Sequence, residues 1–293
     1  MPDPAYEKLN IQWYPGHMTK ARRMIEENIS LVDAVCEVLD ARIPSASANP
    51  DIRRLSEGKP RLVVLNRCDL ADPSATALWR CTLEESGVAV LETDARSGKG
   101  VNAFVPAVRR LLADRRKAFE EKGQAGRALR IMILGIPNVG KSTLINKIAG
   151  RKAALASDRP GVTRGKQWIA LSEGIDLLDT PGILWPKFES AEVGRRIAWI
   201  GSVNDQILVT TELAEQLLVF IADGYPGLIN TYYGIEENTE GIAERGAELL
   251  SRIAARRGCL RKGGEPDLER AAAMVTDDFR SVRIGRISLE RPE

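Results

Sequence analysis

Hydrophobic positions follow two alternating patterns over the first 180 residues. Short runs rich in β-branched and aliphatic residues lie at 32–39, 61–66, 88–93, 129–135 and 175–179. Between them, apolar residues recur with helical spacing over 16–29, 74–86, 99–119 and 141–150. This alternation predicts an α/β fold with a mostly parallel sheet, helices on both faces and ligands at the carboxyl ends of the strands.

The pattern changes beyond about residue 185, where the β-rich runs stop. Helical spacing continues over 190–201, 211–222, 240–256 and 266–280, with glycine and proline between these segments. We therefore expect an α/β domain over 1–187, followed by a smaller all-helical C-terminal domain over 188–293.

A phosphate-binding loop is the strongest chemical signal. Gly135 to Ser142 reads G-x-x-x-x-G-K-S, after the apolar run 131–134 and before a helical stretch. Glycines let backbone N–H groups face phosphates, while Lys141 is expected to reach the β- and γ-phosphates and Ser142 to ligate Mg²⁺. The nucleotide-binding residues expected here are Pro137, Asn138, Val139, Gly140, Lys141, Ser142 and Thr143.

A second phosphate-side motif is Asp179-Thr180-Pro181-Gly182, which follows an apolar run. A carboxylate at Asp179 can hold Mg²⁺ through water, and the N–H of Gly182 can reach a γ-phosphate oxygen. By itself D-x-x-G is a weak signal. Thr163, between the two motifs, is the candidate for a second hydroxyl ligand of Mg²⁺, with a plain polar loop residue as the alternative.

The base is read by Asn66-Arg67-Cys68-Asp69, at the end of the run 61–65. An ionised Asp69 can accept from the two donors of guanine, N1–H and N2, which adenine lacks, so the motif favours GTP and leaves a P-loop ATPase as the weaker alternative. Arg67 stands where lysine is usual, and the two are not interchangeable in detail. The stretch from Thr93 to Ser97, after another strand-like run, is expected to complete the guanine pocket, with Asp94, Ala95 and Arg96 as its nucleotide-binding residues.

The order of these motifs is reversed, since the base motif precedes the phosphate loop. Together with Trp13-Tyr14-Pro15-Gly16-His17-Met18, Asp40-Ala41-Arg42-Ile43-Pro44 and Asn138-Val139-Gly140-Lys141-Ser142, this order resembles the circularly permuted GTPases of the ribosome biogenesis GTPase A family. The resemblance extends over nearly the whole chain. It implies a P-loop GTPase domain with permuted motif order, and a GTP-hydrolysing factor that joins a late precursor of the large ribosomal subunit, with the helical domain touching rRNA.

The resemblance also suggests how hydrolysis is assisted. Ile183 and Leu184 occupy the place where many GTPases carry a glutamine that orients water. The matching histidine of the family, His17 here, is implicated in activating water, although a structural histidine is the alternative. Asn138 matches the position that holds K⁺ in potassium-activated GTPases, so K⁺ is expected beside Mg²⁺.

Composition adds limits on compartment and partners. The 293 residues are 44% hydrophobic, with no apolar run near the roughly 20 residues that cross a bilayer, so we expect a cytoplasmic protein without membrane insertion. The sequence does not give the oligomeric state, and we take a monomer as the starting expectation. Four scattered cysteines without a C-x-x-C pair argue against a zinc knuckle.

The net charge of +2 does not by itself indicate nucleic acid. Basic residues gather over 109–130 and at Arg252, Arg256, Arg257, Arg261 and Lys262, either as solvated helix faces or as contacts to a phosphate backbone. The competing class of function is a GTP-dependent switch that binds a protein partner with little turnover.

Overall fold

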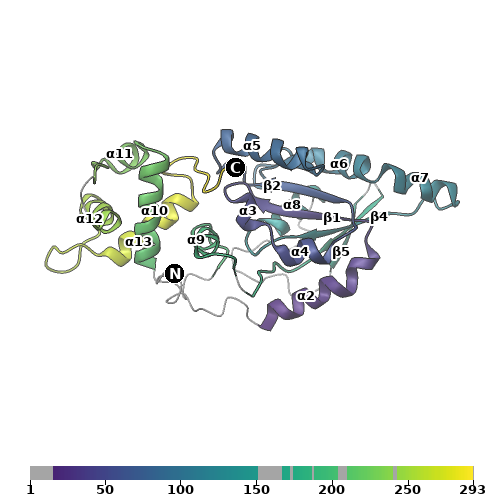
Figure 1. The fold of residues 1–293 in the computed structure, drawn as a ribbon, viewed down its shortest axis with the longest axis horizontal. Coiled ribbons are helices and arrows are strands. Elements are labelled where there is room, and N and C mark those ends of the chain that lie inside the picture. The colour runs from purple at the N-terminus through teal and green to yellow at the C-terminus, as the bar shows by residue number, and fades with distance from the viewer. Residues whose placement is uncertain are drawn as a thin grey trace. The chain divides into compact units, whose positions relative to one another are not determined.

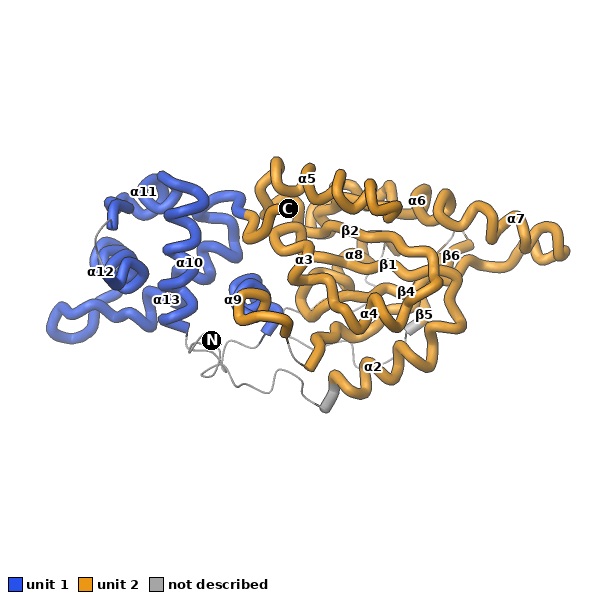
Figure 2. The backbone as a smooth tube through the Cα atoms, in the orientation of Figure 1, with its two compact units in different colours: residues 1–11, 194–287 blue, residues 12–193, 288–293 orange. Residues whose placement is uncertain are grey.

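The computed structural model describes residues 16–150, 167–171, 174–186, 188–203, 210–239 and 243–292. They form two compact units, coloured separately in Figure 2. Of the described residues, the α/β unit comprises those from 16 to 193 together with 288–292, and the helical unit comprises those from 194 to 287. The expected domain boundary at 187/188 lies about six residues before this division, and the last described residues return to the α/β unit.

A six-stranded sheet forms the centre of the α/β unit, with helices on both faces (Figure 1). Its strands are β1 (Ala34–Asp40), β2 (Arg61–Asn66), β3 (Ala89–Glu92), β4 (Leu129–Leu134), β5 (Gln167–Leu171) and β6 (Ile175–Asp179), in the order β3-β2-β1-β4-β6-β5. All neighbours are parallel except β5 and β6. The predicted mostly parallel α/β fold is confirmed, and each of the five predicted runs overlaps one strand.

Burial explains why the central strands were visible in the sequence. Every residue of β1 is buried, and β2 and β4 are nearly so, because helices cover both sides of a parallel sheet. Their register brings the ends of β1 and β2 side by side, with Asp40 opposite Asn66, and places Ile133 of β4 opposite Asp179 of β6. The carboxyl ends that carry the predicted motifs therefore share one edge of the sheet.

The helices of the α/β unit include three that the hydrophobic pattern located well: α2 (Gly16–Asn28), α5 (Pro73–Glu85) and α8 (Lys141–Ile148). The single helix expected over 99–119 is instead divided into a 3₁₀ turn, η2 (Val101–Ala103), and two helices, α6 (Phe104–Leu111) and α7 (Ala113–Glu121). A further 3₁₀ turn, η1 (Ile29–Leu31), follows α2, and two short helices, α3 (Pro44–Ser47) and α4 (Pro50–Leu55), follow β1.

The helical unit packs around α10 (Thr210–Gly224), which contacts α11 (Leu228–Tyr233), α12 (Arg245–Arg257) and α13 (Leu268–Arg280). Helix α9 (Ala191–Trp199) leads from the α/β unit into it. Helices α10 and α12 come very close at Gly246, where an added Cβ would lie 2.7 Å from the carbonyl oxygen of Glu215. Among the described residues from 188 onward there is no strand, as the sequence predicted.

The helices of both units are short or carry polar faces. Within the described ranges, none has both the length and the apolar character needed to cross a bilayer.

Candidate nucleotide-binding site

The phosphate loop lies between β4 and the first turn of α8, the strand-loop-helix setting that its sequence predicted. Gly140 has φ 96°, in the left-handed region, and a Cβ there would collide with the side-chain amide of Asn66, so the position requires glycine. Since α8 begins at Lys141, the positive end of its helix dipole lies at the loop, where it favours a phosphate.

Lys141 is buried at the base of this loop. Its Nζ donates to the carbonyl oxygens of Gly135 at 3.2 Å and of Ile136 at 2.9 Å. Burial lowers the pKa of Lys141 to about 8, and the nearby carboxylate of Asp179 opposes that shift. An anion placed beside the ammonium would add countercharge, which is what a nucleotide phosphate provides.

Asn66 ties three segments of the site together. Its Nδ2 donates to the carbonyl of Val139 in the phosphate loop at 2.9 Å. Its Oδ1 accepts from the Thr93 hydroxyl at 3.0 Å and from the Ala95 N–H at 3.1 Å. The base motif, the loop after β3 and the phosphate loop are thus held in one arrangement. Thr93 belongs to the stretch that the sequence assigned to the guanine pocket, and its bond to Asn66 gives that residue a specific structural role.

Arg67 bridges the base motif and the phosphate loop. One guanidinium nitrogen, Nη2, donates to the carbonyl of Asn138 at 2.5 Å, and the other, Nη1, lies 3.4 Å from the carboxylate of Asp40. Arg67 and Asn138 both have positive φ, 61° and 57°, which is uncommon for residues other than glycine. The guanidinium therefore joins two turns of unusual backbone conformation.

Asp40 is completely buried and is held mainly by Arg42, through the backbone N–H at 3.0 Å, Nε at 2.9 Å and Nη2 at 2.8 Å. Burial alone would raise the pKa of Asp40, but Arg42 and then Arg67 outweigh it and lower that pKa. The sequence pointed to Asp40 and Arg42 only as part of a family-like motif and gave neither a role.

Two carboxylates lie near each other in the predicted guanine pocket. Asp94 is mostly buried and accepts from the backbone N–H groups of Arg96 and Ser97. Burial, together with the negative charge of Asp94, raises the pKa of Asp69 above its usual value. Asp69 remains the exposed member of the pair, so its carboxylate is open to a base.

The segment after β6 touches the phosphate loop closely. A Cβ at Gly182 would lie 2.6 Å from both N and Cα of Pro137, so only glycine fits. The Ile183 N–H donates to the Gly135 carbonyl at 3.3 Å, and the Thr180 hydroxyl donates to the Ile133 carbonyl at 2.6 Å. Movement of the phosphate loop and of this segment must therefore be coupled.

The donor set suits a divalent cation that prefers oxygen. The Ser142 hydroxyl and the fully buried Asp179 carboxylate are oxygen ligands of the kind Mg²⁺ takes, and both belong to the phosphate-side motifs around Lys141. Thr163 lies outside the described residues. The backbone of His17 lies in the first turn of α2, whereas its side chain is not described.

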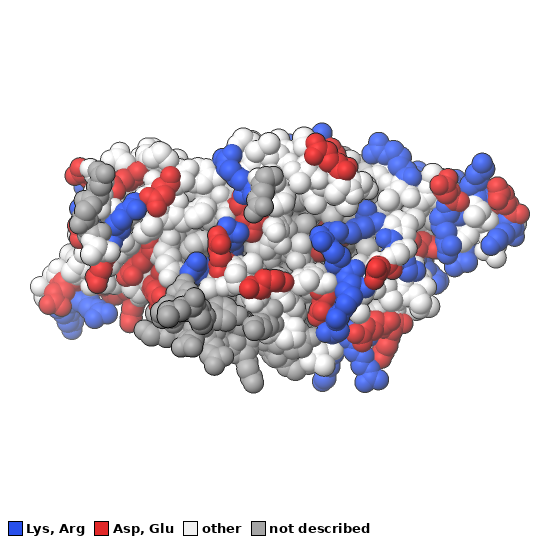
Figure 3. All heavy atoms as spheres, viewed as in Figure 1, with Lys and Arg blue, Asp and Glu red and all other residues white. Residues whose placement is uncertain are grey.

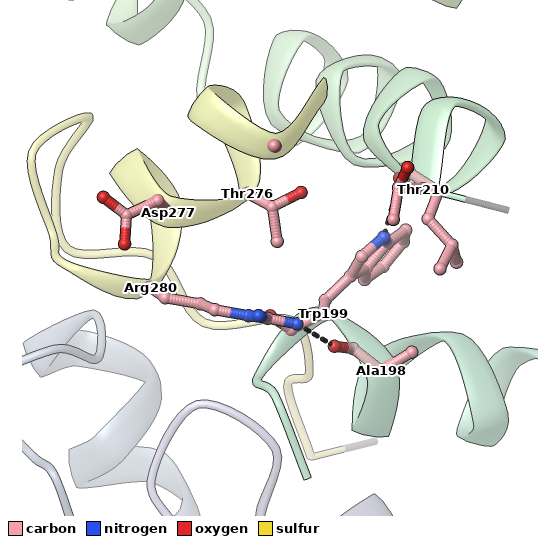
Figure 4. A pocket seen from close by; sticks show the side chains of 8 residues that line it. Ala198, Trp199, Thr210, Thr276, Asp277 and Arg280 are labelled. Carbon is pink, nitrogen blue, oxygen red and sulfur yellow. Dashed lines mark hydrogen bonds between the residues drawn. The ribbon is translucent and has the colours of Figure 1, made fainter. Parts of the chain in front are cut away.

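A hollow of about 240 Å³ lies within the helical unit and is lined by none of the nucleotide-site residues (Figure 4). Arg280 crosses it to donate from Nη2 to the Ala198 carbonyl at 2.7 Å and from Nε to the Trp199 carbonyl at 2.8 Å. These bonds satisfy carbonyls at the end of α9, so Arg280 caps that helix.

Comparison with known proteins agrees with this geometry. Residues 130–252 match the family described as 50S ribosome-binding GTPase. The chain is 43% identical to ribosome biogenesis GTPase A of Bacillus licheniformis over 97% of this chain and 99% of that protein. The chain belongs to the ribosome biogenesis GTPase A family. The corresponding protein of Priestia megaterium is 44% identical over 97% and 98% of the two chains.

Members of the ribosome biogenesis GTPase A family also share the fold. The crystal structure of GNP-bound YlqF from T. maritima matches with a TM-score of 0.66 and 30% identity, over 94% of this chain and 99% of that one. The predicted circularly permuted GTPase fold is thereby confirmed, as is GTP hydrolysis as the activity. P-loop GTPases of this kind generally use Mg²⁺, and the oxygen donors of Ser142 and Asp179 suit that ion.

Proposed function

We propose that this GTPase is an assembly factor that acts in late maturation of the large ribosomal subunit, in the cytoplasm, as a monomer. The names of its relatives, at more than 40% identity over almost the whole chain, carry this proposal. A more distant relative is a mitochondrial ribosome-associated GTPase of Mus musculus, 33% identical over 96% of this chain and 90% of that protein.

In this proposal the guanine base binds between the base motif and the loop after β3. Asp69 accepts from the base, Asn66 holds the surrounding loops, and the segment Asp94–Arg96 closes the pocket. The bonds from Thr93 and Ala95 to Asn66 support this assignment, because they fix the loop against the base motif.

The phosphates bind along the loop from Pro137 to Thr143. Lys141 exchanges its two carbonyl partners for phosphate oxygens, and the N–H of Gly182 contacts the γ-phosphate. Ser142, Asp179 and Thr163 hold Mg²⁺, which neutralises charge on the β- and γ-phosphates. Because Gly182 packs on Pro137, loss of the γ-phosphate would be felt first in the segment after β6.

Hydrolysis needs a group to position water. Ile183 and Leu184 are buried and apolar, so neither can do so. We assign the task to His17 and assign charge neutralisation to K⁺ held by Asn138. The helix carrying His17 is fixed to the α/β unit, since Arg22 of α2 pairs with Asp51 of α4 at 3.0 Å.

The helical unit is the part we assign to rRNA. Arg256, Arg261 and Lys262 are exposed at the end of α12 and in the loop before α13. Figure 3 shows basic and acidic atoms interspersed over this face of the molecule. Arg257 stacks over Tyr232, 4.9 Å from the ring centroid, and Arg252 pairs with Glu248. In the basic stretch around α7, arginines already pair with acidic residues: Arg116 with Glu120 and Arg115 with Asp33.

Co-sedimentation with ribosomal subunits in GTP, GDP and a non-hydrolysable GTP analogue tests the proposal. We expect binding to large-subunit precursors with the analogue and release with GDP. Reversing the charges of Arg256, Arg261 and Lys262 should weaken binding and flatten its dependence on salt, because fewer counterions are released. Capture of a non-ribosomal protein alone, with negligible GTP turnover, would instead indicate a switch for a protein partner.

A further inference from the structure

Three residues that follow the helical unit, Ser288–Glu290, pack back into the α/β unit. We call them the strap. The exposed fractions of Ser288, Leu289 and Glu290 are 3%, 1% and 5%. Such deep burial is unusual for serine and glutamate. In Figure 2 the chain end, marked C, lies beside α5 and α3 in the colour of the α/β unit.

The strap is bonded to the two segments that flank the base site. On one side, the Leu289 N–H donates to the Arg42 carbonyl at 2.8 Å. On the other side, the Ser288 hydroxyl accepts from the Asp72 N–H at 3.1 Å, at the start of α5, just after the base motif. Trp79 of α5 donates to the Glu290 carbonyl at 3.3 Å.

Glu290 forms the most directed of these contacts. Its Oε2 accepts from the Ser45 N–H at 2.7 Å and its Oε1 accepts from the Ala46 N–H at 2.9 Å. Hydrogen bonds of this kind, from backbone N–H to a buried carboxylate, are among the stronger ones in proteins. Together with the Leu289 bond, they fix the backbone on both sides of Ile43, and hence the position of Arg42.

Arg42 connects the strap to the phosphate loop through the side chains of Asp40 and Arg67. Its guanidinium holds Asp40, Asp40 contacts Nη1 of Arg67, and Nη2 of Arg67 donates to the carbonyl of Asn138. Arg67 reaches its two partners from different nitrogens. A lysine carries a single nitrogen on a linear chain, so we expect it to keep the Asn138 carbonyl and to lose the longer contact to Asp40.

We propose that Glu290 is a positioning residue for nucleotide binding, which acts through Arg42, Asp40 and the forked side chain of Arg67 to hold the phosphate loop at Asn138. This inference concerns the GTPase reaction and does not depend on the ribosomal partner. It also gives a physical reason for arginine in place of lysine in the base motif.

The test measures release of a fluorescent GDP analogue from the full chain by stopped flow, well below the melting temperature. Glu290→Ala should accelerate release about tenfold, equivalent to about 1.4 kcal/mol. Glu290→Gln, which keeps the shape and one acceptor oxygen, should give a smaller acceleration and guards against misfolding of the alanine variant. Arg291→Ala is the matched control, because Arg291 is 54% exposed and pairs with Asp72 at the surface.

A double-mutant cycle then tests whether the effect of Glu290 on nucleotide release passes through Arg67. In an Arg67→Lys background, Glu290→Ala should change GDP release by less than about twofold, since the link to Asp40 is already broken. Unchanged release in both Glu290 variants of the natural chain would overturn the proposal. So would additive effects of the Arg67 and Glu290 changes, because a purely structural role lowers the melting temperature without this coupling.

Discussion

At the residue scale, the choice of base rests on the carboxylate of Asp69. Asp69→Asn should lower GTP affinity by about 10²- to 10⁴-fold, because two hydrogen bonds to a charged group contribute about 1.5–3 kcal/mol each. The new amide donor suits the second carbonyl of xanthine, so XTP should now bind better than GTP. Competition between the two nucleotides measures this. A variant that still prefers GTP would show that Asp69 does not read the base.

Lys141 gives the site a pH dependence of its own. Its pKa of about 8 in the free protein should rise when phosphates bind, so the complex holds a proton that the free protein lacks above that pH. GTP affinity should therefore fall as the pH rises through about 8, by up to roughly tenfold per unit, and be flat below about 7. Titration calorimetry from about pH 7 to about pH 9 measures the slope.

The control for this pH dependence is Lys141→Arg. Its guanidinium stays charged throughout the range, so whatever slope remains belongs to the nucleotide or to other groups. An equal slope in both proteins would exclude Lys141 as its source.

Asn138 is the residue we connect with K⁺. If a monovalent cation sits beside it, hydrolysis should be faster in KCl than in NaCl at equal ionic strength, because the ion neutralises charge that develops between the phosphates. Asn138→Ala should remove that difference while leaving GTP bound. Equal wild-type rates in the two salts would remove K⁺ from the mechanism.

At the element scale, the close approach of α10 and α12 at Gly246 makes a specific stability prediction. Gly246→Ala should lower the free energy of unfolding of the helical unit by about 1–3 kcal/mol, because the new methyl group overlaps the Glu215 carbonyl. Gly224→Ala, at the end of α10, has no atom within 4 Å of its Cβ and should be neutral or slightly stabilising. Thermal melting of both variants separates packing from helix propensity.

Most of the strands that the sequence predicted are strongly buried. Strands β1, β2, β4 and β6 lie inside the sheet between helices, and half-buried β3 still forms an apolar run. Strand β5, the antiparallel edge strand beside β6, was missed. Helices α3 and α4 span only four and six residues, too few to show a helical period.

The sequence predicted those parts of the nucleotide site whose residues belong to a recognisable local motif. The phosphate loop and the base motif have fixed spacings, so the amino-acid sequence alone was enough to place Lys141 and Asn66. It was not enough for Asp40 and Glu290, because their roles depend on partners 27 and 245 positions away. No local pattern encodes a contact of that separation.

At the scale of the whole molecule, the permuted order joins the segment after β6 directly to α9 and the helical unit. We expect hydrolysis by the free protein to be slow and strongly stimulated by large-subunit precursors, because the partner completes the catalytic arrangement. His17→Ala should lose about 10²- to 10⁴-fold of the stimulated rate, with GTP affinity nearly unchanged. Single-turnover hydrolysis with and without subunits measures this.

A structural histidine would behave differently. Its loss would lower the melting temperature or GTP affinity together with the rate, so both are measured on the same variant. Full stimulation of His17→Ala by subunits would end the catalytic assignment.

The buried strap also has a consequence for how the protein is made. Synthesis proceeds from β1 through β6 to the helical unit, and Ser288–Glu290 leave the ribosome after all of them. Until then, the N–H groups of Ser45 and Ala46 lack the carboxylate that they meet in the finished protein. A nascent chain can therefore form its sheet early, but its guanine site matures only when translation has passed the helical unit. Nucleotide should therefore bind the nascent chain more weakly before the strap has left the ribosome than after it has docked.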